Sequence, residues 1–271
     1  MDDKNRQDVA RQAANVFGAF FQIGAPVLTS EAVGRVSAEN STQVVPANYA
    51  FTIWGPIFLL CLAYAAYQAL PANRDNLLLR RVGWFSAGAF ISNGLWEILF
   101  PARQFILAQI VIVGIFAFSA LAYLRLVRTI RERRLDGAER WLVALPFGML
   151  FGWITAATLV GFATTFVALW LLGGGTGEAL IGAALLLAGG LLASAVLMAG
   201  RDAPLHGYLP YAAAVLWALV AVVVNQYDAS LFTTGAALVA VVLVALALFR
   251  NLSSNRPRRR ESRTLSSDAP A

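Results

Sequence analysis

A series of continuous apolar runs, each about 20 residues long, constrains this chain more than any other feature. The hydrocarbon core of a bilayer is about 30 Å thick, and a helix of roughly 20 apolar residues crosses it. Strands of a membrane β-barrel would instead alternate apolar and polar side chains. The runs therefore predict an all-α, polytopic membrane bundle. We expect about eight transmembrane helices, at residues 12–29, 50–70, 82–100, 105–124, 141–163, 179–199, 208–226 and 229–249.

Positive charge is biased to one side of this arrangement. All 21 Lys and Arg residues except Arg35 and Arg103 fall in the termini or in the loops of one side. Cytoplasmic segments of membrane proteins are enriched in Lys and Arg. We therefore expect both termini to be cytoplasmic and the chain to lie in the cell (inner) membrane. The mixed acidic and basic head, Asp2 to Asp8, does not have the pattern of a cleavable signal peptide.

The net charge of +6 is best explained by membrane topology. The segment 251–271 is rich in Ser, Arg and Pro and lacks an apolar period, so it is predicted to be a disordered basic cytoplasmic tail. Its arginines suit anionic lipid, and the absence of interleaved aromatic residues argues against nucleic acid. The expected partners are membrane lipid and a small apolar ligand, with no nucleic acid, and a homodimer is left open.

Composition excludes several classes of enzyme and metal site. Charged residues make up 13% of the chain, about half of the roughly 25% found in soluble domains. Cys61 is the only cysteine and His206 the only histidine, which excludes an intramolecular disulfide, a cysteine-based zinc site and a site with paired histidines. No paired Asp-rich motif exists beyond Asp2-Asp3, and no nucleotide-binding fingerprint is found. We expect no enzyme, no metal and no covalently held cofactor.

Polar side chains inside the apolar runs are few and share helix faces. Asn93, Trp96 and Glu97 stand at i, i+3 and i+4 of the third run, and Asn15 and Gln22 lie two turns apart in the first. Charged and amide groups within a membrane are costly and usually face the bundle interior. Two alternatives stay open for them, a surface that faces ligand or water and simple hydrogen bonding between helices.

The tryptophans differ in their expected depth. Trp84 and Trp141 lie at cytoplasmic helix ends, where indoles anchor helices at the interface. Trp153 and Trp217 lie near the middle of their runs, where a buried indole N–H needs a hydrogen-bond partner. Core packing is the alternative to a binding role for both.

Three segments together resemble a known family. They are residues 46–56 (PANYAFTIWGP), 93–96 (NGLW) and 153–158 (WITAAT). Their order, and the long loop between the first two spans, resemble the tryptophan-rich sensory protein / translocator protein family (TspO-type). The resemblance covers about residues 8–165. It implies a TspO-like five-helix membrane core at 1–165, with 166–250 as an additional three-helix membrane segment.

The resemblance also implies a pocket for porphyrins or sterol-like ligands. A bound porphyrin or haem would then be held noncovalently, for sensing or transport. Rings would stack on the ligand, and an amide would hydrogen-bond to its polar edge. The candidate ligand-binding residues are Tyr49, Phe51, Trp54, Asn93, Trp96 and Trp153.

Other functions stay open at this point. The chain could be a proton-coupled secondary transporter of a small solute in which Glu97 carries the proton. Breakdown of a bound porphyrin has been proposed for some relatives, and a scaffold acting through the basic loop 125–140 is a further alternative. The equal spacing of Pro146 to Trp153 and of Pro210 to Trp217 leaves open an internal duplication, or a role for 208–226 as the family's last helix.

Overall fold

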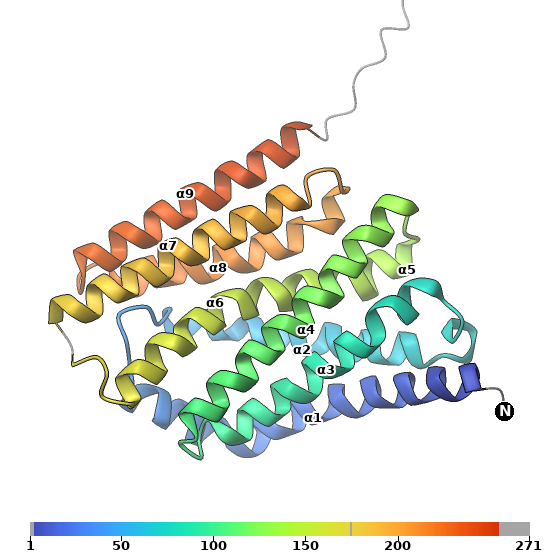
Figure 1. Cartoon of the computed structure of the whole chain (residues 1–271), viewed down its shortest axis with the longest axis horizontal. Helices are drawn as coiled ribbons and strands as arrows, with labels where there is room; N and C mark the ends of the chain where they lie inside the picture. Colours follow the sequence, from blue (N-terminus) through green and yellow to red (C-terminus); the bar gives the residue numbers. More distant parts are fainter. Residues whose placement is uncertain (1–2, 174, 255–271) are drawn as a thin grey trace, which may run out of the picture.

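The computed structural model describes residues 3–173 and 175–254, and eight long helices account for most of them (Figure 1). These residues contain no strand, which confirms the all-α prediction. The long helices are α1 (Asp3–Glu39), α2 (Trp54–Ala69), α3 (Leu77–Leu99), α4 (Phe105–Glu132), α6 (Leu145–Ala168), α7 (Gly175–Ala199), α8 (Leu209–Gln226) and α9 (Leu231–Ser254).

Short helical turns join several of these helices. They are η1 (Asn48–Ile53), η2 (Pro71–Asn73), α5 (Gly137–Glu139), η3 (Arg140–Ala144) and η4 (Leu205–Gly207). The turn η3 is a π turn, in which the Leu145 N–H donates to the Arg140 carbonyl oxygen. Pro146 follows directly and has no N–H to continue an α-helical ladder, which favours the wider turn at this point.

The described helices form a polytopic bundle, as predicted. Seven of them are long and apolar enough to cross a membrane by length and composition. The eighth, α3, is not in that set; it carries two arginines as well as Asn93 and Glu97, and it packs against both α1 and α4. α1 begins and α9 ends at the same end of the bundle, as an even number of spans requires (Figure 1). Which end is cytoplasmic stays a prediction.

Several boundaries differ from the predicted ones. α1 extends beyond 12–29 in both directions and contains Pro26 without a break. α9 continues through Ser254, so residues 251–254 of the predicted tail are helical, and Asn251 Nδ2 donates to the Leu197 carbonyl oxygen at 2.8 Å. The rest of that tail, 255–271, lies outside the described residues. The predicted boundary between 165 and 166 falls inside α6, and the division into a core and an addition stays a prediction.

Small residues bring α6, α8 and the helices around them close together. A Cβ placed on Gly152 of α6 would lie 2.5 Å from the Tyr211 carbonyl oxygen of α8. A Cβ on Gly190 of α7 would lie 2.7 Å from the Cβ of Ala240 in α9. Helices in bilayers associate through such close van der Waals packing. α7 and α8 both pack against α6 and against α9.

Candidate ligand cavity

A cavity of about 830 Å³ lies in the half of the bundle that contains the connection between α1 and α2. Its walls come from α1, α2, α3, α4, α6, α7 and α8 and from the segment 41–51, and most of the lining side chains are apolar. Small-molecule sites have volumes of about 300–1,000 Å³ and an apolar, aromatic lining with a few polar groups. The cavity therefore has the size and the lining of a ligand site.

The connection between α1 and α2 lies along this cavity and is fixed to α8. The Ala47 N–H donates to the Ala221 carbonyl oxygen at 3.0 Å. Trp217 Nε1 donates to the Ala50 carbonyl oxygen at 2.9 Å, which confirms the expectation that its indole finds a partner. These bonds set the position of η1, and η1 leads directly into the aromatic residues at the start of α2.

An aromatic cluster forms one wall, with Trp153 at its centre. The Trp153 ring lies 5.8 Å from Phe51 and 6.1 Å from Trp54, both in edge-to-face geometry. Trp54 stacks on Phe58 at 4.9 Å. Trp153 is 3% exposed, and within the described residues its Nε1 has no hydrogen-bond partner. A buried indole N–H normally has an acceptor, and this one has none among the described residues.

The predicted face of α3 forms a second wall. Asn93, Trp96 and Glu97 all line the cavity, and Trp96 stacks on Phe100 with ring centroids 4.8 Å apart. Asn93 Nδ2 donates to Gln22 Oε1 at 3.3 Å, so one amide joins α3 to α1. Glu97 is 7% exposed and is the sole charged side chain among the lining residues described.

The structure brings together all but one of the predicted binding residues. Phe51, Trp54, Asn93, Trp96 and Trp153 line the cavity. Tyr49 does not line it, because its ring packs edge-to-face on Trp217 at 5.3 Å and is 41% exposed. The binding roles of all six stay predictions.

Sequence reasoning missed the wall that α8 supplies. Its lining residues recur every three or four positions, which places them on one helix face. The same spacing occurs on any apolar helix that packs in a core, so the sequence does not distinguish the two cases. The residues are Val215, Ala218, Leu219, Val222 and Asn225.

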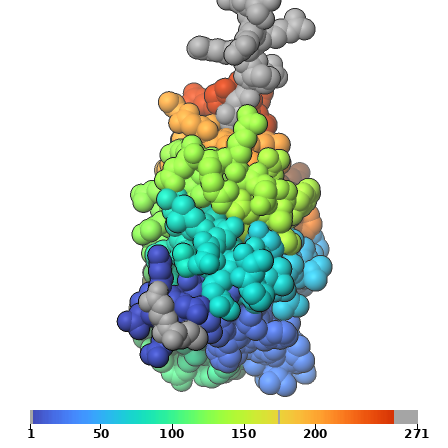
Figure 2. Space-filling model, turned by 90° about the vertical axis from the view of Figure 1, so that its right-hand side faces the viewer, coloured from blue at the N-terminus to red at the C-terminus, as the bar shows by residue number. Residues whose placement is uncertain are grey.

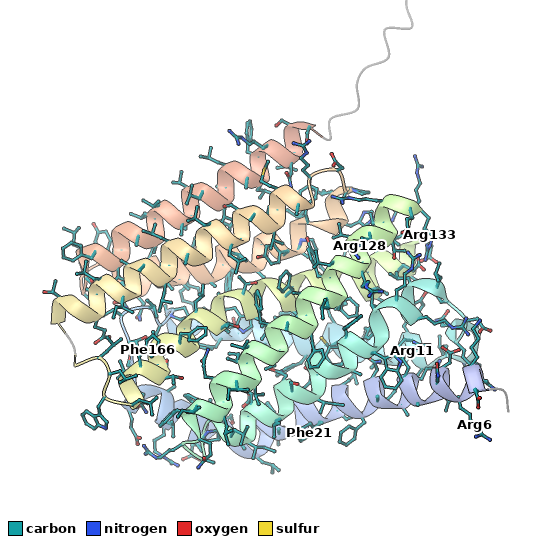
Figure 3. The ribbon with its side chains drawn as sticks, in the orientation of Figure 1. Arg6, Arg11, Phe21, Arg128, Arg133 and Phe166 are labelled. Carbon is teal, nitrogen blue, oxygen red and sulfur yellow. The ribbon has the colours of Figure 1, made fainter. Side chains whose placement is uncertain are left out.

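A buried arginine lies towards the opposite end of the bundle. Arg11 in α1 is 1% exposed, and Figure 3 shows it within the bundle. Its guanidinium donates to the carbonyl oxygens of Leu79 (3.3 Å) and Arg74 (3.1 Å) and contacts Asp8 and Gln68 at 3.4 Å. A buried charge needs such partners. In the sequence Arg11 was counted with the charges of the N-terminal segment, and its burial was not predicted.

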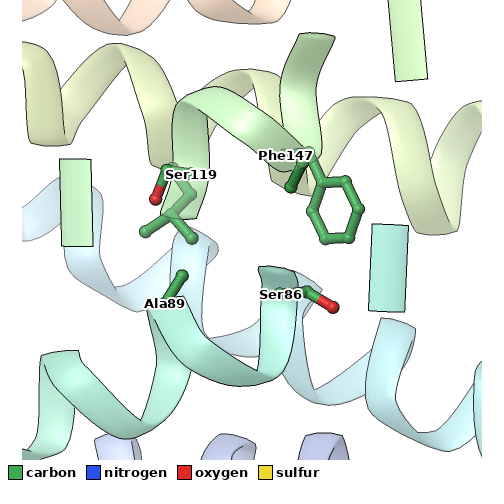
Figure 4. Close-up of a pocket in the computed structure, with 6 residues that line it drawn as sticks. Ser86, Ala89, Ser119 and Phe147 are labelled. Carbon is green, nitrogen blue, oxygen red and sulfur yellow. The ribbon is translucent and has the colours of Figure 1, made fainter. Parts of the chain in front are cut away.

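Polar contacts continue from Arg11 along the interface of α1, α2 and α3. Asn15 Nδ2 donates to the Gly83 carbonyl oxygen at 2.7 Å, and Ser86 Oγ donates to Asn15 Oδ1 at 2.6 Å. The Tyr64 hydroxyl lies 2.9 Å from Ser86 Oγ. Figure 4 shows Ser86 beside a narrow gap between α3, α4 and α6, which has no room for a water molecule. This network is a packed structural element.

Ion pairs cover the end of the bundle beyond Arg11. Figure 2 looks onto this end, where the start of α1, the segment 70–76 and the region of α5 are visible together. Arg133 donates to both carboxylate oxygens of Glu139, at 2.7 and 2.6 Å, and Asn76 Nδ2 donates to the same carboxylate at 3.0 Å. Hydrogen bonding to Glu139 raises the pKa of the Arg133 guanidinium above its usual value. Such paired charges tie the turns of this end together.

Together, the helices and the cavity define a multi-pass helical membrane protein with an internal cavity. The chain belongs to the TSPO-like protein family, whose model matches residues 13–249. The resemblance drawn from the sequence is thereby confirmed. The match also includes α7, α8 and most of α9, the helices that the resemblance had set apart. No curated protein and no solved structure matches the chain.

Proposed function

We propose that this membrane protein binds a flat, largely apolar ligand in the cavity, for sensing or for transport. A porphyrin or other tetrapyrrole and a sterol-like molecule are the proposed ligands. The observation that carries the proposal is the cavity of about 830 Å³ whose walls include the aromatic cluster around Trp153. Flat ligands stack well on such rings, because aromatic pairs add attraction beyond simple burial.

Polar groups of the lining have separate roles in this proposal. The free Trp153 N–H donates to an acceptor on the ligand. Asn93, which lies one helical turn from Glu97 and is tied to Gln22, hydrogen-bonds to the polar edge of the ligand. Few, fixed polar groups in an apolar site set the orientation of a ligand.

The proposed setting is the inner cell membrane, with lipid around the bundle. Large apolar side chains of α1 are exposed on its outer surface, among them Phe17, Phe20, Val27 and Leu28. Contiguous exposed apolar surface of this kind suits lipid contact. A homodimer belongs to the same proposal, and the mass of the purified protein in detergent, measured by light scattering, tests it.

Quenching of tryptophan fluorescence tests the binding proposal. Protoporphyrin IX and haem are titrated into the detergent-purified protein and into a Trp96→Ala/Trp153→Ala double variant. We expect saturable quenching in the parent protein and affinity weaker by about tenfold or more in the double variant, since each ring removed costs about 1 kcal/mol of contact.

A matched control removes the same number of indoles away from the cavity. Trp84 and Trp141 are 51% and 68% exposed and do not line it. The Trp84→Ala/Trp141→Ala double variant should keep the parent affinity. Quenching that rises linearly, or that is equal in both double variants, would indicate partitioning into detergent and would contradict the proposal.

A second candidate function is proton-coupled transport through Glu97. It is favoured by a carboxyl group that lies buried in the cavity, since such intramembrane groups commonly mark proton relays. In this case, entry of protoporphyrin IX into proteoliposomes would depend on a pH gradient and would stop in Glu97→Gln. Equal entry with and without the gradient would contradict coupling.

A further inference from the structure

We propose that Glu97 gives this cavity a preference for ligands that carry a cationic nitrogen, such as a protonated amine. This inference rests on the proposed ligand-binding function and adds a charge preference to it. It predicts that flat cations bind better than flat anions of the same size.

The position of Glu97 is the first argument. Its side chain is 7% exposed, yet it lines the cavity beside Trp96 and one helical turn from Asn93. The hydroxyl of Thr29 is close enough to interact with the carboxyl group, but that hydroxyl already donates to the Ala25 carbonyl oxygen at 2.9 Å. A hydroxyl has one proton to donate and carries no positive charge, so Thr29 leaves the carboxylate without a charged partner.

The charges around Glu97 are the second argument. Among the described residues that line the cavity there is no Lys, Arg, His or Asp. A carboxylate taken out of water is costly unless it is paired. Since the protein supplies no cation in the lining described, a cationic ligand would supply the missing charge.

The same end of the bundle is acidic outside the cavity as well. At this end Arg103 forms an ion pair with Glu39. The other charged residues in the described segments of this end are the acidic Glu31, Glu178 and Asp228 and the basic Arg35. Oriented surface charge of one sign concentrates ligands of the opposite sign near a site. The approach to the cavity thus favours a cation, as the cavity itself does.

The aromatic rings that line the same cavity as Glu97 are the third argument. Trp96, Phe100, Trp54 and Phe58 line the same cavity in two stacked pairs. A cation over an aromatic face is attracted by the ring quadrupole, most strongly over tryptophan and away from water. A cavity that is lined by both a carboxylate and these rings therefore favours a flat aromatic cation over a flat anion.

Three planar three-ring probes of different charge test the inference. They are 9-aminoacridine (a cation at neutral pH), 9-methylanthracene (neutral) and 9-anthracenecarboxylate (an anion), each titrated into the full-length protein in a non-ionic detergent. We expect the cation to bind about tenfold more tightly than the anion, the size of one charge-assisted contact. Glu97→Gln should remove this preference.

Two control variants test whether the charge of Glu97 causes the preference for the cation. Glu97→Asp keeps the charge and should retain the preference for the cation. Glu31→Gln removes an exposed acid that does not line the cavity, and it should reduce the preference far less than Glu97→Gln does. Circular dichroism of each variant checks that the helices form.

The outcomes separate the inference from the proposed function. Saturable binding of the neutral probe, with equal affinity for cation and anion in the parent protein, overturns the inference and leaves the proposed function standing. A cation preference that persists in Glu97→Gln overturns it as well. If no probe binds saturably, the proposed function fails together with the inference.

Discussion

Replacing Gly152 by alanine tests how tightly α8 is packed into this fold. The glycine lies in α6 at its contact with α8, where a Cβ would stand 2.5 Å from the Tyr211 carbonyl oxygen and 2.9 Å from the Cβ of Ala214. The nearest atom is helix backbone, which cannot rotate away as a flexible side chain can. The two helices would have to separate by a substantial part of an ångström.

The expected magnitude follows from two opposing effects. Overpacking of a close contact costs about 1–3 kcal/mol. The higher helix propensity of alanine over glycine returns about 1 kcal/mol. We therefore expect Gly152→Ala to lower the free energy of unfolding by up to about 2 kcal/mol.

A second glycine provides the matched control. Gly114 lies inside α4, and no neighbouring atom stands within 4 Å of a Cβ placed on it. Gly114→Ala should leave the free energy of unfolding unchanged or raise it by up to about 1 kcal/mol. Unfolding is followed by circular dichroism as SDS is titrated into mixed micelles. Equal effects of the two substitutions would refute the close packing of α6 on α8.

Two further substitutions test other contacts. A Cβ on Gly83 would lie 2.6 Å from Cδ of Arg11, so Gly83→Ala should displace the buried guanidinium. We expect it to lower the free energy of unfolding by about 3–5 kcal/mol in the same titration. A smaller decrease than that of Gly152→Ala would contradict a tightly held hydrogen-bond network around Arg11. Trp217→Phe keeps an aromatic ring but removes the N–H that donates to the Ala50 carbonyl oxygen, at a cost of about 0.5–1.5 kcal/mol. Amide hydrogen exchange across 47–53 should accelerate in that variant, and unchanged exchange would show that this bond does not hold η1.

The membrane-spanning helices could be predicted because bilayer thickness fixes the length of an apolar run. The full length of α1 could not be predicted in this way. Its first turns carry Asp8, Arg11 and Gln12, which are buried through bonds to α2, α3 and the turn between them. Polar side chains of this kind are satisfied by residues far away in the chain, and a local pattern of hydrophobicity does not contain those partners.

Helical spacing by itself predicted only the α3 wall of the cavity, whereas Phe51, Trp54 and Trp153 were predicted from the family resemblance. Helical spacing places Asn93, Trp96 and Glu97 on one face, and all three line the cavity. The position of Tyr49 in the turn η1 could not be predicted from spacing. The Ala50 carbonyl oxygen accepts a hydrogen bond from Trp217 of α8, and the Tyr49 ring packs against Trp217 and does not line the cavity. The geometry of a short turn held by a distant helix does not follow from sequence spacing.

Filling the cavity tests the central claim most directly. Ala157 lines the cavity, whereas Ala66 of α2 is exposed on the outer surface. Phenylalanine at either position adds a ring without adding or removing an indole, so tryptophan quenching by protoporphyrin IX stays comparable among the proteins. We predict that Ala157→Phe loses saturable quenching while Ala66→Phe keeps the parent affinity. Equal affinity in all three proteins would contradict binding inside the cavity.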